Sequence, residues 1–509
     1  MVQESTWVTA AVGTGVVILA GFLVNQYFAK QRLPDSPRQP SAQPARQAPT
    51  AETLSRARGA IASVPSSSWK RPTKAKEQPG GSVRISEARK NSEWAWDNVV
   101  QEAKALREKG ATWRDPEFSP DDASLFMDPS NPPTDWLRDG ERGSVISDAV
   151  VCWKGPENFC PAKRPLGKRA DGQPTWLYSD ADGDGVATAL DMSGEEVCQG
   201  SLGDCYLLCA LAAAARDLSL ADDLIDEEFE DVGIYGVSLW VHNRWEMVWV
   251  DRNFPCFRPA KSSHLGRWRL IFASCEDPKE IWPIVVEKAY AKLAGSYEAL
   301  TGGRIVEALC ALTGGSGAAI DLTRGRIGPK DLLELLGSGS FGEKGDRFLG
   351  AGTRSDLDPG FAQGIVPSHA YTILDCRQVA GTTLLKLRNP WNRGEWTGDW
   401  SDASAKWRTA EGRNAAKELH HQSKDDGEFW MAAEDFLARF HTIDFCDVCT
   451  TGREARLAAL RASVGKAARS GGGGGGGGSA KEDTRSIDEL MLEIEGPPKK
   501  QKKKKGKGK

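Results

Sequence analysis

The chain has 509 residues, a formal net charge of −4 and 11 cysteines. This length exceeds one ordinary hydrophobic core, so several segments are expected. The odd number and scattered spacing of the cysteines argue against a disulfide scaffold and favour a reducing compartment. Charge is unevenly divided, because residues 30–90 and the C-terminal end are basic whereas the middle of the chain is acidic.

The first notable segment is the uncharged run Trp7–Phe28, which has the length of a membrane span and aromatic residues at its ends. A cleaved signal peptide is the alternative, but such peptides usually begin with positive charge, and here only Glu4 precedes the run. Lys30 and Arg32 follow, so the positive-inside rule predicts that the remaining chain faces the cytosol. Residues 1–30 are therefore predicted to be a single-pass membrane anchor, with no indication of which membrane.

The flanks of the chain have the composition of disordered segments. Residues 31–91 are rich in Pro, Ser, Ala, Gln and Arg, which predicts a disordered basic linker. Residues 451–509 are predicted to be a disordered tail, because they contain the glycine run 471–478 and a lysine-rich end. Contact of the basic flanks with anionic lipid is one interpretation, and solvated flanks are the alternative. No specific nucleic-acid binding is predicted from terminal lysines alone.

Residues 92–450 have the composition of a folded body. After a helical or extended lead-in over 92–150, the part 151–315 is rich in helical periodicity, as in DPKEIWPIVVEKAYAKLAGSYEAL. The part 316–450 alternates strand-like runs, among them HAYTILDCRQV, TTLLKLRNPW and FHTIDFCDV. A helical half followed by a strand-rich half predicts an α+β fold of two lobes with a cleft between them.

The segment CQGSLGDCYLLCALAAAARDL contains a candidate nucleophile. Ala and Leu dominate after Gly203 and Asp204, so a helix is expected to begin at Cys205. The helix N-terminus favours a thiolate there, which predicts a lowered pKa for the Cys205 thiol. Taken alone, a buried helical cysteine is the simpler interpretation. Gln199 favours chemistry, because its amide and the Cys205 N–H would form the pair of donors that acyl transfer needs.

A thiolate nucleophile also needs a base. His369 follows a proline turn at the start of an apolar strand, whereas an isolated histidine in such a place is usually structural. Asn389 precedes Pro390 after the next strand-like run, so it is expected to be extended or in a turn. Neighbouring strands would place its carbonyl beside the imidazole. Cys, His and Asn in this chain order predict a thiol-protease triad.

These residues closely resemble the calpain family of calcium-dependent cysteine proteases. The likeness lies in CQGSLGDCYLL, VEKAYAKLAGSYEALTGG, SHAY, LRNPW, EWTGDWSD and DDGEFWMAAEDFL, and runs from roughly Trp113 to Cys446. It implies a papain-like fold in two lobes, with the catalytic and oxyanion roles given above. It also implies that substrate approaches Gly303 and that Trp391 lies near the cleft. Tyr206 departs from the family, which has Trp after the nucleophile.

The resemblance further implies two regulatory calcium ions within the protease core. Their implied ligands are acids of both lobes: Glu196, Glu280, Glu395, Asp402, Asp426 and Glu428. Solvated acidic faces are the alternative. An insertion before Glu196 has the spacing of a calcium loop, with an acidic turn as the alternative. Its candidate ligands are Asp180, Asp182, Asp184 and Asp191.

Together these features predict a membrane-anchored, calcium-dependent cysteine endopeptidase that makes limited cuts in intracellular proteins. One alternative is a catalytically weak or inactive scaffold that keeps the fold and binds calcium. A transglutaminase-like acyl transferase is a further alternative, although its third residue would normally be Asp rather than Asn389.

Overall fold

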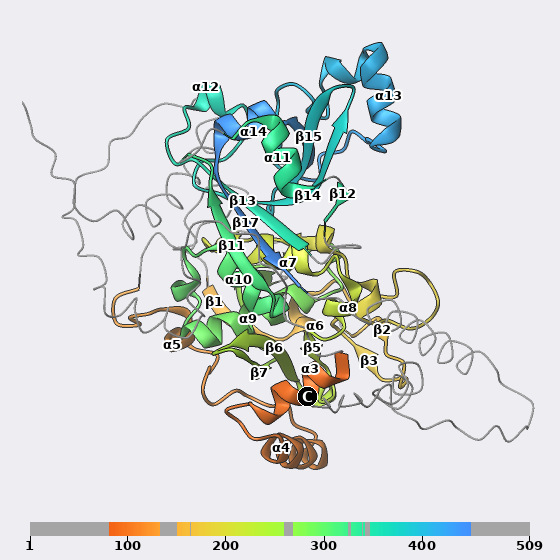
Figure 1. The fold of residues 1–509 in the computed structure, drawn as a ribbon. Coiled ribbons are helices and arrows are strands. Elements are labelled where there is room, and N and C mark those ends of the chain that lie inside the picture. The colour runs from red at the N-terminus through yellow and green to blue at the C-terminus, as the bar shows by residue number, and fades with distance from the viewer. Residues whose placement is uncertain are drawn as a thin grey trace, which may run out of the picture.

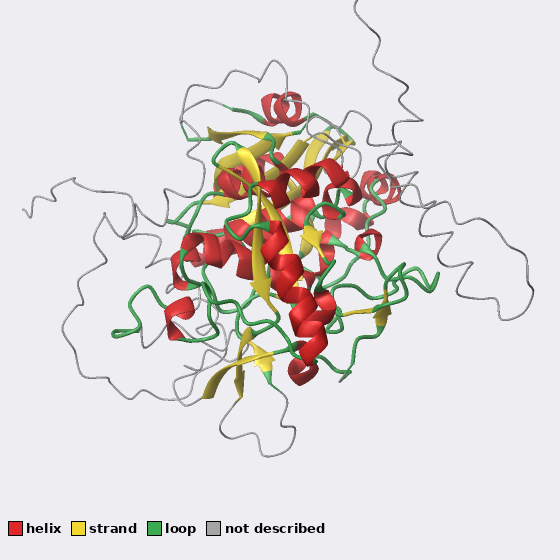
Figure 2. Ribbon diagram, turned by 90° about the horizontal axis from the view of Figure 1, so that it is seen from below, coloured by secondary structure: helices red, strands yellow, loops and turns green. Residues whose placement is uncertain are grey.

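The computed structural model describes residues 81–132, 150–162, 164–258, 268–323, 327–337, 339–341 and 347–448. Within these residues the chain is α+β, with helices gathered between antiparallel sheets (Figures 1 and 2). The predictions for residues 31–80 and 451–509 lie outside the described part.

The predicted single-pass membrane localisation needs correction. Among the described residues no helix is long and apolar enough to cross a membrane. The longest helix there has 14 residues, whereas a span needs about 20. The run Trp7–Phe28, on which the prediction rested, lies outside the described residues.

Two N-terminal helices pack on a three-stranded sheet. They are α3 (Gly81–Lys90) and α4 (Trp96–Lys109), and the strands are β5 (Ile225–Asp226), β6 (Ile234–Val241) and β7 (Arg244–Asp251). Arg84 is buried and donates hydrogen bonds to Ser238 Oγ at 2.8 Å and Leu312 O at 3.0 Å. The prediction of disorder as far as residue 91 was therefore wrong for residues 81–90. Composition did not reveal that a buried arginine, with its hydrogen bonds, holds this helix on the body.

The helical lobe, residues 151–315, is centred on α7 (Cys205–Ala214), α9 (Trp282–Ala294) and α10 (Ile305–Thr313). All three are almost wholly buried, which explains why most of their residues are apolar, although α9 also buries Glu287 and Lys288. Helix α9 confirms the predicted helix in DPKEIWPIVVEKAYAKLAGSYEAL. The shorter elements of this lobe and its lead-in are α5 (Asp122–Leu125), β1 (Val150–Lys154), α6 (Pro156–Phe159), β2 (Gly167–Lys168), β3 (Pro174–Thr175), β4 (Val197–Cys198), α8 (Leu218–Ala221), β8 (Phe254–Arg258), β9 (Arg269–Leu270) and β10 (Ser274–Cys275).

The helical lobe also contains strands that its helical pattern did not predict. Strands β6 and β7 form a hairpin joined by His242 and Asn243, with φ of 51° and 62°. Two positive φ values are typical of the two-residue turn that matches strand twist.

The sheet lobe, residues 316–448, holds a seven-stranded sheet in the order β11-β17-β13-β14-β15-β16, with β12 paired to β14. Strands β14, β15 and β17 confirm the three predicted strands. The strands are β11 (Ser316–Asp321), β12 (Gly339–Ser340), β13 (Arg347–Thr353), β14 (Ala370–Val379), β15 (Thr382–Arg388), β16 (Glu428–Ala432) and β17 (Phe440–Asp447). The helices are α11 (Pro329–Leu336), α12 (Pro359–Ala362), α13 (Ala410–Glu418) and α14 (Ala433–Arg439).

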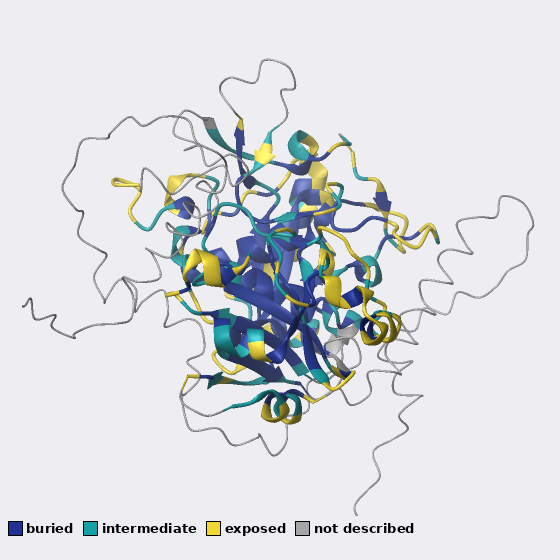
Figure 3. Cartoon of the chain, turned by 90° about the horizontal axis from the view of Figure 1, so that it is seen from above, coloured by how far each residue is buried: buried dark blue, intermediate teal, exposed yellow. Residues whose placement is uncertain are grey.

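The two lobes meet where α7 packs against β13 and β14, and α10 against β11 and β17 (Figure 1). Thr372 Oγ1 of β14 donates a 3.0 Å hydrogen bond to Cys209 O of α7. The buried segments lie together in the centre and the exposed ones towards the rim (Figure 3). This contact brings the first residue of α7 to the beginning of β14.

Candidate active site

Cys205 is the first residue of α7, as predicted, and Asp204 is the N-cap. The thiol is partly buried against the core of the helical lobe. The turn before Cys205 is fixed to the loop that contains Gly302 and Gly303, because Gly302 N–H donates a hydrogen bond to Gly203 O at 2.9 Å. The local sequence thus presents Cys205 at the end of a rigid, buried helix.

His369 and Asn389 meet at the ends of neighbouring strands. His369 immediately precedes β14, Asn389 immediately follows β15, and the two strands pair in an antiparallel way. The His369 Nε2 atom lies 2.9 Å from Asn389 Oδ1, and both side chains are buried. The structure therefore brings these two predicted residues together.

The asparagine amide fixes the tautomer of the histidine. Asn389 Nδ2 donates to Arg393 O at 2.8 Å and to Gly394 O at 2.9 Å, so Oδ1 is turned towards the imidazole as an acceptor. Nε2 then carries the proton and Nδ1 is left as the basic nitrogen. The Trp391 ring lies 4.6 Å from the His369 ring between centroids, and the backbone N–H of Trp391 also donates to Asn389 Oδ1 at 3.1 Å. Trp391 thus contacts the histidine ring, and its predicted place near the substrate cleft stays a prediction.

The electrostatics of the thiol differ from the prediction. Burial raises the pKa of Cys205 to about 12, against the effect of a backbone hydrogen bond from Ala370 that lowers it. Burial lowers the pKa of His369 to about 4, and the hydrogen bond to Asn389 acts in the opposite direction. In the part of the chain that the structure describes, no hydrogen bond joins the thiol to the imidazole. Both groups are neutral at pH 7, because desolvation outweighs the helix N-terminus on which the predicted fall in pKa rested.

Gln199 lies beside the nucleophile but its amide is engaged elsewhere. Nε2 donates to Leu202 O at 2.7 Å, and the backbone N–H donates to Pro390 O at 2.8 Å. The second bond ties this turn to the loop that follows Asn389. In this arrangement the amide is turned to its own loop and not presented as an oxyanion donor.

Gly303 is exposed, and a methyl group at this position would meet the ring of Tyr206 at 2.4 Å. A glycine is therefore required here by the residue that follows the nucleophile. The same lack of a side chain leaves the backbone open to an approaching chain, and substrate contact at this glycine stays a prediction.

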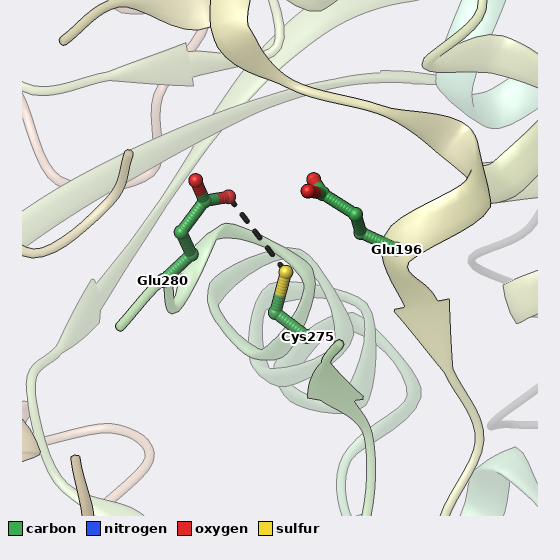
Figure 4. Close-up of side chains that lie close together, drawn as sticks. All are labelled: Glu196, Cys275 and Glu280. Carbon is green, nitrogen blue, oxygen red and sulfur yellow. Dashed lines mark hydrogen bonds between the residues drawn. The ribbon is translucent and has the colours of Figure 1, made fainter. Parts of the chain in front are cut away.

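The acids expected to bind calcium in the helical lobe converge. Glu196 and Glu280 lie with Cys275 in a group whose ligand atoms are all within 4.8 Å of one another, and both carboxylates point to the space above the sulfur (Figure 4). Burial and the nearby Glu280 raise the pKa of Glu196 to about 7. Facing carboxylates of this kind fit a calcium ion, which would neutralise their repulsion. Sequence reasoning missed Cys275, although the pairing of β10 with β4 accounts for its position beside Glu196.

The acids expected to bind calcium in the sheet lobe are neighbours but do not converge in the same way. Glu395 Oε1 accepts hydrogen bonds from the N–H groups of Asp426 and Gly427, at 3.0 and 2.9 Å. Asp402 accepts one from Lys424 N–H at 2.7 Å, and Glu428 pairs with Lys386. Burial, with the nearby Asp402, raises the pKa of Glu395 to about 7. Among the described residues these acids form no cluster of three converging ligand atoms. Their loops would have to rearrange before they could surround an ion.

The insertion before Glu196 folds into an acidic turn. Asp180, Asp182 and Asp184 are exposed and bring their oxygens within 4.8 Å of one another. Asp191 is not one of these three converging residues; its carboxylate caps a short helical turn by accepting from Thr188 N–H and contacts the acidic turn by accepting from Ala181 N–H. The acidic turn is thus present, the carboxylate of the predicted twelfth ligand accepts backbone hydrogen bonds, and calcium binding by this loop stays a prediction.

Comparison with known proteins agrees with the architecture of this site. Residues 113–447 match the sequence model of the calpain family of cysteine proteases. The chain is 36% identical to the calpain-type cysteine protease DEK1 of Zea mays over 358 residues, which cover 68% of this chain and 14% of that protein. It is 35% identical to calpain-9 of Homo sapiens over 262 residues, covering 50% and 36%. It is 32% identical to calpain clp-1 of Caenorhabditis elegans over 355 residues, covering 66% and 38%. The aligned region thus spans less than half the length of each relative.

Proposed function

Because the chain belongs to the calpain family of cysteine proteases, we propose that it is a calcium-dependent endopeptidase that makes limited cuts in other proteins. The observation that carries this proposal is the buried His369–Asn389 pair at 2.9 Å, set where β14 meets the helix that begins with Cys205. The described cysteines are all free, which supports substrates within a reducing compartment.

In the proposed reaction, Cys205 gives its proton to Nδ1 of His369 and the sulfur attacks the scissile carbonyl carbon. Asn389 Oδ1 holds the Nε2–H of the resulting imidazolium and stabilises its orientation. The Cys205 N–H and a rotated Gln199 amide donate to the oxyanion. His369 then returns its proton to the leaving amine. Water, deprotonated by the same imidazole, hydrolyses the thioester and frees the enzyme.

Calcium, when bound, would supply positive charge that neutralises the clustered carboxylates. In the helical lobe Glu196 and Glu280 would hold it, at the start of the strand that leads to Gln199. Arg388 of the sheet lobe donates to Val197 O at 2.8 Å in that strand. In the sheet lobe Glu395, Asp402, Asp426 and Glu428 would hold the second ion. Glu395 follows Gly394, whose carbonyl accepts from Asn389. The acidic residues of each lobe therefore adjoin a segment that positions a catalytic side chain.

The proposal is tested with the full chain and unfolded casein, with free calcium titrated and Cys205→Ala in parallel. Cleavage that rises with calcium and disappears in the variant is the expected result. Cleavage that is independent of calcium would refute the proposed regulation while retaining the protease. A folded protein without cleavage at any calcium concentration would refute the protease.

A catalytically inactive calcium-binding scaffold is the second candidate. It is favoured by one observation, namely that Cys205 and His369 share no hydrogen bond among the described contacts, and burial disfavours the charged form of each by raising the pKa of the thiol and lowering the pKa of the imidazole. A scaffold would bind calcium without any change in the reactivity of Cys205. An activatable enzyme would become more reactive towards a thiol alkylating agent when calcium is added.

A further inference from the structure

Cys275 turns the acidic group of the helical lobe into a mixed sulfur and oxygen site. Its Sγ lies 3.7 Å from Glu280 Oε2, and the Glu196 carboxylate reaches the same space from the opposite side (Figure 4). Cys275 and Glu280 are buried, and Glu196 is half-buried. We propose that Glu196, Cys275 and Glu280 bind a thiophilic divalent cation such as Zn²⁺.

Two sets of contacts hold these three residues in place, namely the β4–β10 pairing and the hydrogen bonds from Ser179 to Glu280. Cys275 pairs with Val197 across the β4–β10 ladder, and Glu276 N–H donates to Glu196 O at 2.8 Å. Glu280 stands in the turn before α9, where its Oε1 accepts from Ser179 N–H at 2.8 Å and Ser179 Oγ at 2.7 Å. Its other oxygen, Oε2, is the one that faces the sulfur. The group is thus built from separate segments whose backbones are already fixed.

The donor set discriminates between classes of metal. Calcium takes six to eight oxygen ligands and gains little from a thiol, whereas zinc binds thiolate and carboxylate in a tetrahedron. A tetrahedral zinc ion with usual bond lengths sets its sulfur and oxygen ligands about 3.5 Å apart. The observed separation of 3.7 Å between Cys275 Sγ and Glu280 Oε2 is close to this edge. With Glu196 as third ligand, water would complete the tetrahedron. The thiol proton passes to solvent as sulfur binds.

The inference rests on the proposed function in one respect, because Zn²⁺ and Ca²⁺ would share the Glu196 and Glu280 carboxylates. The shared site adjoins the strand that leads to Gln199, and Asn392 Nδ2 of the sheet lobe lies 3.0 Å from Cys198 Sγ in that strand. Zinc with three protein ligands would occupy the site without recruiting the further oxygens that calcium requires. Zinc is therefore expected to act as a competitor of calcium.

The test uses the full chain with Cys205→Ser, so that the nucleophile cannot bind the probe. Cd²⁺ is added to follow thiolate-to-metal charge-transfer absorption, and Zn²⁺ affinity is measured against a chromophoric chelator. The charge-transfer band is expected in this protein and in a Cys198→Ser control, but not in Cys275→Ser. Loss of a supporting residue of a metal site already weakens binding 10- to 100-fold, so Cys275→Ser should weaken Zn²⁺ binding at least about 100-fold.

A band that persists in Cys275→Ser, or unchanged Zn²⁺ affinity, would overturn the inference. Cys275→Ala, with circular dichroism as a folding control, serves if the serine variant fails to fold. Failure of the proposed function would give a different result. Casein cleavage by protein with intact Cys205 would then not depend on calcium, while the charge-transfer band that depends on Cys275 would remain. Calcium-dependent cleavage without the band would refute the zinc site alone.

Discussion

In the sheet lobe His369, Asn389 and Trp391 already form a hydrogen-bonded group in which the two rings are in tilted contact, whereas in the helical lobe burial raises the pKa of the Cys205 thiol and the Gln199 amide binds Leu202. The difference arises from what surrounds each half. Antiparallel strands fix the histidine and asparagine by backbone pairing, while the cysteine and glutamine lie in a turn where the Gln199 amide donates to its own Leu202 carbonyl. The comparison indicates that activation has to rearrange the catalytic groups of the helical half, Cys205 and Gln199, whereas the His369–Asn389 pair of the sheet half can keep its geometry.

The largest effect is expected from the half that has to rearrange. Gln199→Ala should lower kcat about 100- to 1000-fold with little change in KM, because an oxyanion donor acts in the transition state. Steady-state peptide cleavage at saturating calcium measures this, with the exposed Gln173→Ala as control. A loss confined to KM would show that Gln199 does not rotate into the oxyanion site.

The assembled half is tested by removing its orienting residue. Asn389→Ala should lower kcat/KM about 100-fold, since a freed imidazole is misplaced relative to the sulfur. The matched control is Asn158→Ala, whose side chain binds the nearby Gly155 O and Glu157. Wild-type activity in Asn389→Ala would mean that the observed hydrogen bond does not orient the base.

The buried histidine also predicts a pH dependence of stability. The pKa of His369 lies at about 4, below its usual 6.5, so between these values the unfolded chain binds more protons than the folded one. This contribution to stability is complete above pH 6.5 and is lost as pH falls towards 4. From pH 7 to pH 5 it amounts to about 2 kcal/mol.

Urea unfolding of the wild type and His369→Gln at both pH values isolates this contribution. The free energy of unfolding of the variant should fall by about 2 kcal/mol less than that of the wild type over this interval. The control is the exposed histidine variant His420→Gln, which should retain the wild-type difference. If the free energy of unfolding falls by the same amount between pH 7 and pH 5 in the wild type and in His369→Gln, the imidazole is not held neutral by burial.

Hydrophobic periodicity and turn residues predicted the helices and strands whose formation depends on neighbouring residues in the sequence. The Ala/Leu run after Cys205, the strands on either side of Asn389 and the helix that follows Glu280 all lie where periodicity and turn residues indicate. Cys275 could not be found in this way, because its partner Val197 is distant in sequence and joined only by a short ladder. The pKa of Cys205 also failed to follow from its helix position, since burial depends on the whole fold.

The central claim is that calcium converts a neutral Cys205 into a working nucleophile. With a pKa of about 12, on the order of one thiol in 10⁵ is ionised at pH 7. The alkylation rate of Cys205 by iodoacetamide, followed by mass spectrometry of the full chain with buried Cys209 as internal reference, tests this claim directly. The account predicts slow alkylation without calcium and at least a tenfold acceleration at saturating calcium, equivalent to about one pKa unit. Rapid alkylation in calcium-free protein, or a rate that calcium leaves unchanged, would contradict it.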